Sequence, residues 1–230
     1  MKYSDLFRAT GGIVPAGYTI IGSIQDSLHD VWGLWSDDGK TMVIGFGGTL
    51  GDLFPHPSLD WLNDAKFWHE KAFLGGMRYR GEDGFVSQYL AEALAIKNWV
   101  RVYQPDEILV AGFSKGGALM ALCVADLIEV YPGRKIVGIG FGSPRAFDEC
   151  SSETLESIME RSNGLYRIEQ YRVWGDPVPD ALPWFLGYRH VGKVRYVGPY
   201  RLIPSFMIPN PYHNATSYPN DLEALGEFVV

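Results

Sequence analysis

The sequence predicts an α/β fold with a mostly parallel sheet flanked by helices, and three observations support this prediction. From about residue 85 onward, apolar runs of strand length alternate with segments of helical periodicity, which is the pattern of βαβ units. Two of the runs, 108–111 and 135–141, are apolar enough to indicate buried strands. The 230 residues can bury a sizeable core, and no repeat or linker divides them, so we expect one domain over residues 1–230.

The first part of the chain is expected to form a short helix and a hairpin. A helix is predicted over residues 3–9, followed by a Gly/Pro-rich loop. Strands are predicted over 18–24, 30–35 and 40–46. Asp37-Asp38-Gly39 is a strong turn signal between the last two, so residues 30–46 read as a hairpin.

The remaining elements follow from periodicity and from the Pro and Gly residues that interrupt it. Residues 75–84 are predicted to be a loop, and 85–103 a helix that ends at Pro105-Asp106. After the 108–111 strand, the predicted order is helix 118–128, strand 135–141, helix 152–161, strand 165–174, strand or hairpin 187–197, and helix 220–228.

The most informative stretch joins the 108–111 strand to the next helix and reads Gly112-Phe113-Ser114-Lys115-Gly116-Gly117. It contains Gly-x-Ser-x-Gly, the nucleophile-elbow pattern, between a strand and a helix as that motif requires. The turn is so tight that Ser114 must adopt a strained backbone, with glycines on both sides to leave room. The hydroxyl then stands at a helix N-terminus, where amides and the dipole favour a developing negative charge. The alternative is an ordinary capping serine in a Gly-rich turn.

A serine nucleophile needs a base and a carboxylate that orients the base. After an elbow, acid and base are expected in that order, on loops that follow later strands. Asp176 follows the predicted strand 165–174, and His213 lies in the next long loop, so Ser114, Asp176 and His213 have the expected order.

Two residues compete for these roles. His190 is closer to Asp176 in sequence, but its apolar-flanked strand favours a hydrogen-bonded structural histidine. Asp180 could replace Asp176 as the acid, although Pro177 directly after Asp176 favours a strand-ending loop there.

Composition excludes several other classes. The net charge of −7 and the absence of a Lys/Arg cluster argue against a nucleic-acid partner. Cys123 and Cys150 have neither disulfide-framework nor zinc spacing, and no histidine pair has metal spacing, so no metal or cofactor is expected. No stretch approaches a transmembrane span, and the first eight residues are polar, so the expected location is the cytoplasm, or outside the cell without a recognisable signal peptide.

Several segments together resemble the class 3 lipases, also called fungal-type lipases, a family with the α/β-hydrolase fold. The similar segments are residues 43–49, 60–64, 83–85, 112–117, and 175–179 together with 187–190. The aspartate segment with its downstream Gly-Tyr-Arg-His is the most specific of them. Two departures from the family pattern are Gly47 in place of an arginine and Lys115 in place of a leucine.

By this resemblance, Ser114 is the nucleophile, Asp176 the triad acid and His213 the base. The oxyanion hole would use backbone N–H groups of Thr49 and Lys115. The resemblance implies a serine hydrolase of acyl or lipid esters that uses no cofactor and touches a lipid interface transiently. Two other functions stay open: a hydrolase of thioesters, amides or polymer-linked acyl groups, and a non-catalytic binding module of the same fold.

The apolar stretch 50–61 falls where the family places its lid. Leucine, phenylalanine and tryptophan make it unusually apolar for a loop, and two prolines interrupt it. It is therefore either a flap over the site or a loop packed onto the core.

Overall fold

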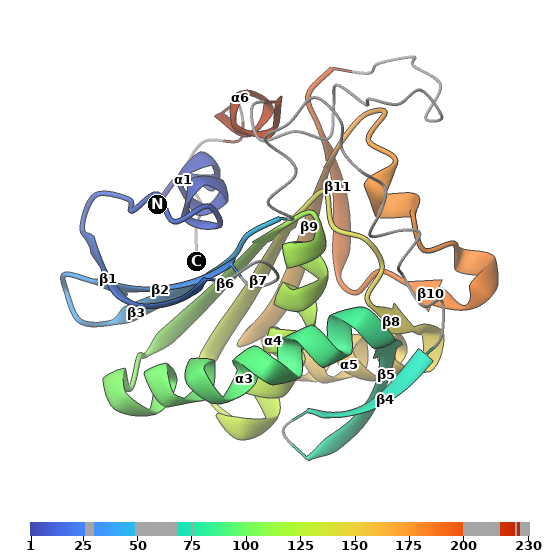
Figure 1. Ribbon diagram of the computed structural model, residues 1–230, viewed down its shortest axis with the longest axis horizontal. Coiled ribbons are helices and arrows are strands. Elements are labelled where there is room, and N and C mark those ends of the chain that lie inside the picture. Colours follow the sequence, from blue (N-terminus) through green and yellow to red (C-terminus); the bar gives the residue numbers. More distant parts are fainter. Residues whose placement is uncertain (26–29, 49–68, 75, 200–216, 224, 226–230) are drawn as a thin grey trace.

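A seven-stranded sheet of order β1-β2-β3-β6-β7-β9-β11 organises the residues that the computed structural model describes, which are 1–25, 30–48, 69–74, 76–199, 217–223 and 225 (Figure 1). Its strands are β1 (Tyr18–Gln25), β2 (Asp30–Ser36), β3 (Thr41–Phe46), β6 (Glu107–Phe113), β7 (Lys135–Phe141), β9 (Tyr166–Val173) and β11 (Lys193–Val197). The strands from β3 to β11 pair in parallel, whereas β1 and β2 add an antiparallel edge. The predicted α/β class with a mostly parallel sheet is confirmed.

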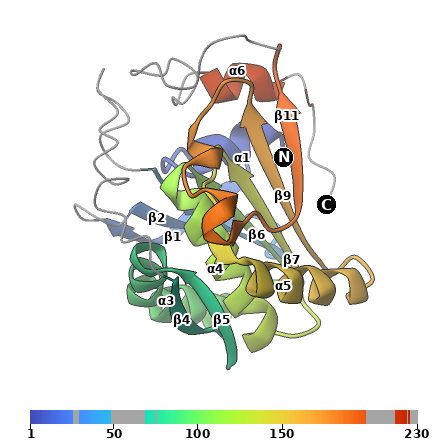
Figure 2. The same ribbon diagram turned by 90° about the vertical axis from the view of Figure 1, so that its right-hand side faces the viewer.

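Helices cover both faces of this sheet (Figures 1 and 2). One face carries α3 (Asp83–Tyr103), α4 (Lys115–Val130) and α5 (Glu149–Arg161), and the other carries α1 (Tyr3–Ala9) and α6 (Ser217–Glu223). Successive side chains of a strand point to opposite faces of the sheet, so those of β6 pack alternately against the two helix layers. Ile108 and Val110 pack with the α3 and α4 residues, while Leu109 and Ala111 pack with Phe7 on the opposite face. Burial on both faces explains why this strand is continuously apolar.

A small four-stranded sheet, β10-β8-β5-β4, lies beside the ends of α3 and α5 (Figure 1). Its strands are β4 (His69–Leu74), β5 (Met77–Glu82), β8 (Phe147–Asp148) and β10 (Tyr188–Arg189). The predicted loop over 75–84 is therefore wrong: most of it is β5, which pairs with β4 around Gly76 at a positive φ of 102°. Buried Tyr79 lies between exposed Arg78 and Arg80, which is the alternation of a strand with one buried face. The two charged residues made this segment resemble a polar loop in the sequence.

Several boundaries also differ from the prediction. The helix expected over 152–161 begins at Glu149, because the Asp148 carboxylate caps it by accepting from the Ser151 N–H at 2.8 Å. The 187–197 segment divides into β10 and β11, which belong to different sheets. The final helix, Ser217–Glu223, begins three residues before the predicted start at residue 220. Two 3₁₀ helices, η2 (Val178–Asp180) and η3 (Trp184–Leu186), occupy the connection that leads from β9 to β10.

Candidate active site

Ser114 occupies a strained turn between β6 and α4. Its backbone has φ 54° and ψ −126°, outside the regions that non-glycine residues prefer. The turn is fixed by the sheet and the helix, because the Ser114 N–H donates to the Phe141 carbonyl of β7 at 2.9 Å and the Ser114 carbonyl accepts from Gly117 N–H at 2.9 Å. This is the strained backbone that the Gly-x-Ser-x-Gly pattern predicts.

The flanking glycines are required by close backbone approach. A Cβ atom on Gly112 would lie 2.1 Å from the carbonyl oxygen of Gly116, and one on Gly116 would lie 2.3 Å from the carbonyl oxygen of Phe46. Both obstacles are backbone atoms, which cannot move aside as a side chain can. The end of β3 is therefore packed directly against the start of α4.

At Gly47, one of the two positions noted above as departures from the family pattern, the neighbouring atoms belong to a side chain. A Cβ atom there would lie 2.1 Å from Oδ2 of Asp30, whose other oxygen accepts from the Trp32 indole N–H at 2.8 Å. An arginine at residue 47 would collide with this carboxylate in its present position. Thr49 and the 50–61 stretch lie outside the described residues.

Lys115 is the first residue of α4, directly after Ser114. The first four N–H groups of a helix have no acceptor within the helix, and they point toward its N-terminal end. The Lys115 backbone N–H is the first of these groups in α4 and directly follows Ser114 in the chain.

Asp176 lies three residues beyond the end of β9 and is only 1% exposed. Its Oδ1 accepts from the Val178 N–H at 2.9 Å, and its Oδ2 accepts from the Tyr218 hydroxyl at 2.5 Å. Because β6 and β9 are parallel strands of one sheet with β7 between them, Ser114 and Asp176 lie at the same edge of the sheet. The sequence prediction for the base, His213, falls outside the described residues.

Tyr218 is a site residue that sequence reasoning missed. It is fully buried on α6, and its hydroxyl also accepts from the Val173 N–H at 3.3 Å. Burial raises the pKa of Tyr218 well above its usual value, and the charge and hydrogen bond of Asp176 add to this effect. The phenol therefore stays neutral and donates to the Asp176 carboxylate. Its sequence signal was weak, because a tyrosine at the start of a helix usually only packs in the core.

The two competitors are engaged elsewhere. Asp180 exposes 53% of its side chain and forms ion pairs with Arg145 at 2.8 Å and Arg172 at 2.6 Å. His190 is partly buried, with its Nε2 at 2.9 Å from the Pro179 carbonyl oxygen. Burial lowers the pKa of His190 to about 4, helped by the charge of Arg145, so the neutral ring donates to that carbonyl. These contacts support Asp176 as the acid and a structural role for His190.

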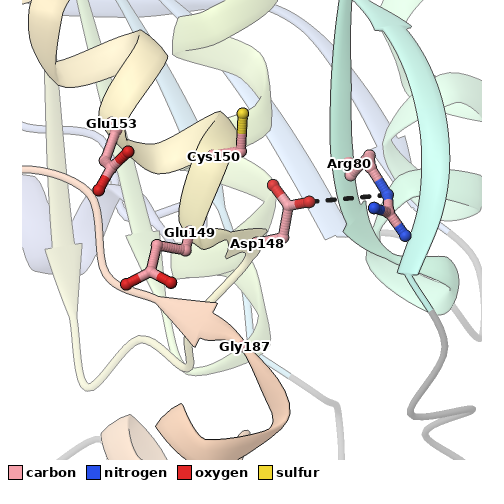
Figure 3. A pocket seen from close by; sticks show the side chains of 6 residues that line it. All are labelled: Arg80, Asp148, Glu149, Cys150, Glu153 and Gly187. Carbon is pink, nitrogen blue, oxygen red and sulfur yellow. Dashed lines mark ion pairs between the residues drawn. The ribbon is translucent and has the colours of Figure 1, made fainter.

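Other site types find little support in the described part of the chain. There, no group of three or more His, Cys, Asp or Glu side chains is placed to hold a metal ion. Among the same residues, every helix is too short or too polar to cross a bilayer. A pocket of about 430 Å³ lies where β5 meets the start of α5, and Figure 3 shows the Arg80–Asp148 ion pair of 3.6 Å at its wall. Of the candidate site residues that the structure describes, Ser114, Lys115 and Asp176 are all absent from its lining.

Comparison with known proteins identifies relatives of the whole arrangement. A family model described as lipase (class 3) matches residues 47–185, more than half of the chain. The matched region includes Ser114 and Asp176 and ends before His213. No curated protein matches the sequence at a significant level.

Solved fungal lipases share the fold. Lipase II from Rhizopus niveus is 20% identical, with a TM-score of 0.62 over 86% of this chain and 69% of that one. The triacylglyceride lipase of Rhizomucor miehei is 20% identical, with a TM-score of 0.63 over 79% of this chain and 67% of that one. A triacylglycerol lipase from Penicillium expansum is 15% identical, with a TM-score of 0.66 over 86% and 78% of the two chains. At these identities, the likeness shows a common fold.

Proposed function

Because this chain belongs to the class 3 lipase family and is a carboxylic ester hydrolase, we propose that it cleaves acyl esters with Ser114 as nucleophile, His213 as base and Asp176 as orienting acid. The single observation that carries this proposal is the strained backbone of Ser114 at φ 54° between β6 and α4. A non-glycine residue adopts such a conformation only when the surroundings impose it, and strain of this kind gathers at functional sites.

The proposed reaction has two halves. In the first, the Ser114 oxygen attacks the ester carbonyl while the imidazole of His213 accepts the hydroxyl proton. The tetrahedral intermediate collapses to an acyl-serine, and the alcohol leaves with the proton from the imidazolium. In the second half, water attacks the acyl-serine, gives a proton to the imidazole, and the acid departs as that proton returns to the serine oxygen.

Negative charge on the tetrahedral intermediate would be stabilised at the N-terminus of α4. We assign one oxyanion donor to the Lys115 backbone N–H and the second to Thr49, each worth about 3 kcal/mol in the transition state. The Val178 amide and the Tyr218 hydroxyl, which donate to Asp176, are both neutral groups. Neither cancels the charge of the carboxylate, which therefore remains able to orient and stabilise an imidazolium.

The proposed substrates are acyl or lipid esters, and exposed apolar residues near the acid support a transient contact with lipid. Trp184, Phe185 and Leu186 on η3 are 65%, 70% and 44% exposed and follow one another directly. Adjacent exposed apolar side chains of this size mark interaction sites, and tryptophan is suited to a lipid–water boundary. We propose that residues 50–61 act with them as a lid.

The activity test uses short p-nitrophenyl esters and two serine variants. Ser114→Ala is expected to lower kcat by about 10⁶-fold, because the nucleophile is lost. Ser143→Ala is the matched control: Ser143 also follows a strand of this sheet, and its buried Oγ has no hydrogen-bond partner among the described residues, so activity should be unchanged. Full activity in a folded Ser114→Ala protein would overturn the proposal.

Two further arms of the same assay test the base and the substrate class. His213→Ala should nearly abolish turnover, whereas His190→Ala should retain much of kcat; the reverse pattern would remove His213 from the triad. With a medium-chain ester, the rate should rise abruptly where the substrate passes its solubility limit. A smooth hyperbola would rule out gating at a lipid interface.

A further inference from the structure

The segment that follows Asp176 is held by one carboxylate shared between two arginines. Asp180 Oδ1 accepts from Arg145 Nη2 at 2.8 Å, and Asp180 Oδ2 accepts from Arg172 Nη2 at 2.6 Å. The arginines come from different parts of the fold, since Arg172 lies on β9 and Arg145 follows β7. Asp180 therefore joins two neighbouring strand ends to η2.

The same arginines also hold the backbone at both ends of this segment. Arg172 Nη2 lies 3.3 Å from the carbonyl oxygen of Asp176, and Arg145 Nη1 donates to the carbonyl of Leu182 at 2.6 Å. Between these points, the His190 ring donates to the carbonyl of Pro179. Side chains from outside the 176–182 segment thus hold it at its start, middle and end.

Packing and charge make this arrangement rigid. The Arg172 guanidinium lies 5.0 Å from the centre of the Tyr196 ring, which stacks on Trp174 at 4.0 Å. Burial alone would raise the pKa of Asp180, but the hydrogen bonds and charges of Arg172 and Arg145 outweigh it and hold that pKa below its usual value. Asp180 therefore remains ionised, and both ion pairs persist at neutral pH.

We propose that Arg145, Arg172 and Asp180 form a positioning clamp that fixes the backbone donor and the main-chain direction of Asp176, and thereby aims its carboxylate at the base. The proposal rests on the proposed function, because it assigns Asp176 the role of triad acid. The link is short: the Val178 N–H that binds Asp176 Oδ1 opens η2, and Asp180 ends the same three-residue helix. Loss of the clamp would let this turn and the carboxylate shift together.

Arg189, which lies downstream of Asp180, provides a matched control. Arg189 donates to Glu149 at 2.7 Å and to the carbonyl of Trp184 at 2.8 Å, so it also joins a carboxylate to a backbone oxygen. This second brace holds η3 rather than the segment that carries Asp176. A general stabilising role predicts similar consequences for both braces, whereas a positioning role predicts an effect on turnover for the clamp alone.

The experiment compares Asp180→Asn with Arg189→Gln in the full chain, using a soluble ester. Asp180→Asn should lower kcat by roughly 10- to 100-fold with KM within about twofold of wild type, because small misplacements of a catalytic group cost about that much. Asp180→Glu, which keeps the charge, should restore part of the loss. Arg189→Gln should leave kcat and KM within about twofold. The proposal would be overturned if kcat fell equally in Asp180→Asn and Arg189→Gln, or if it did not fall in Asp180→Asn.

A second readout does not depend on activity. Hydrogen exchange of the Val178 amide, followed by NMR, should speed up about tenfold or more in Asp180→Asn and stay unchanged in Arg189→Gln. Unchanged exchange in Asp180→Asn refutes the clamp even if the enzyme is impaired. If Ser114→Ala retains activity while Val178 exchange responds as expected, the proposed function fails and the mechanical part of the clamp stands. Arg145→Lys, which keeps the charge but loses the planar fork, gives the same test should Asp180→Asn not fold.

Discussion

Ser114 and Asp176 lie at the same edge of one parallel sheet, but they are held in place by different means. Ser114 is fixed by its own backbone conformation, by adjacent glycines and by main-chain hydrogen bonds to β7 and α4. Asp176 is held by the Val178 amide and, from elsewhere in the fold, by side chains, chiefly the Tyr218 hydroxyl of α6 and the clamp of Arg145, Arg172 and Asp180. We therefore expect the Ser114 turn to be sensitive to atoms added at its glycines, and the position of Asp176 to be sensitive to the loss of single polar groups.

Among substitutions outside the proposed triad, the largest expected effect comes from adding one methyl group at the elbow. Gly116→Ala places a Cβ atom 2.3 Å from the Phe46 carbonyl oxygen and 2.5 Å from that of Gly47. We expect a loss of about 3 kcal/mol or more in unfolding free energy and a fall in kcat of at least 100-fold, because the backbone must shift. Urea denaturation and ester hydrolysis measure the two losses.

The control for the elbow is Gly133→Ala, which has a positive φ of 86° but no atom within 4 Å of the added Cβ. It tests conformational strain without a collision, and it should cost about 1 kcal/mol with no change in kcat. If both substitutions cost the same, close packing is not what requires glycine at residue 116.

An intermediate effect is expected when the donor to Asp176 is removed. Tyr218→Phe deletes a hydrogen bond to a buried carboxylate, and such bonds are worth about 1.5–3 kcal/mol. We expect kcat to fall by roughly 10- to 100-fold. Tyr79→Phe is the matched control, because Tyr79 is equally buried and its hydroxyl has no partner among the described residues. Steady-state kinetics in which both variants behave like wild type would show that Tyr218 only fills space.

The smallest expected effect concerns pH and His190. Burial lowers the pKa of His190 to about 4 in the folded chain, against an ordinary value of 6.5, so the unfolded chain takes up the proton first as the pH falls. The free energy that the lowered pKa of His190 contributes to folding is fully present above pH 6.5 and is lost as the pH falls toward 4. His190→Gln, whose amide can still donate to the Pro179 carbonyl, should remove on the order of 2 kcal/mol of this pH dependence. If the unfolding free energies of the wild type and of His190→Gln changed with pH in the same way, His190 would not have a lowered pKa in the folded chain.

The contrast between nucleophile and acid also explains what the sequence could predict. The elbow was predictable because the residues that mark it, Gly112, Ser114 and Gly116, stand together between an apolar strand and a helix, although Phe46 and Phe141, which contact it, are distant in sequence. The parallel sheet was predictable because β6 and β7 are buried on both faces and are apolar throughout.

The surroundings of Asp176 were not predictable in the same way. Tyr218 lies 42 residues from its partner Asp176, and Arg145 lies 35 residues from Asp180. A local sequence pattern therefore predicts neither contact. The β4–β5 hairpin was missed because the outward arginines at 78 and 80 resemble a polar loop, although Tyr79 between them is buried. In each case, the decisive contacts form only when the chain folds.

Central to the proposed function is one activated serine, Ser114, which the strained turn between β6 and α4 presents to a base. A fluorophosphonate probe tests it most directly, because the probe reacts with an activated serine whatever the natural substrate. The wild-type protein is expected to take up a single label, mapped by mass spectrometry to the peptide that contains Ser114, and the Ser114→Ala protein none. A folded wild-type protein that takes up no label, or takes it up on another serine, would contradict the account.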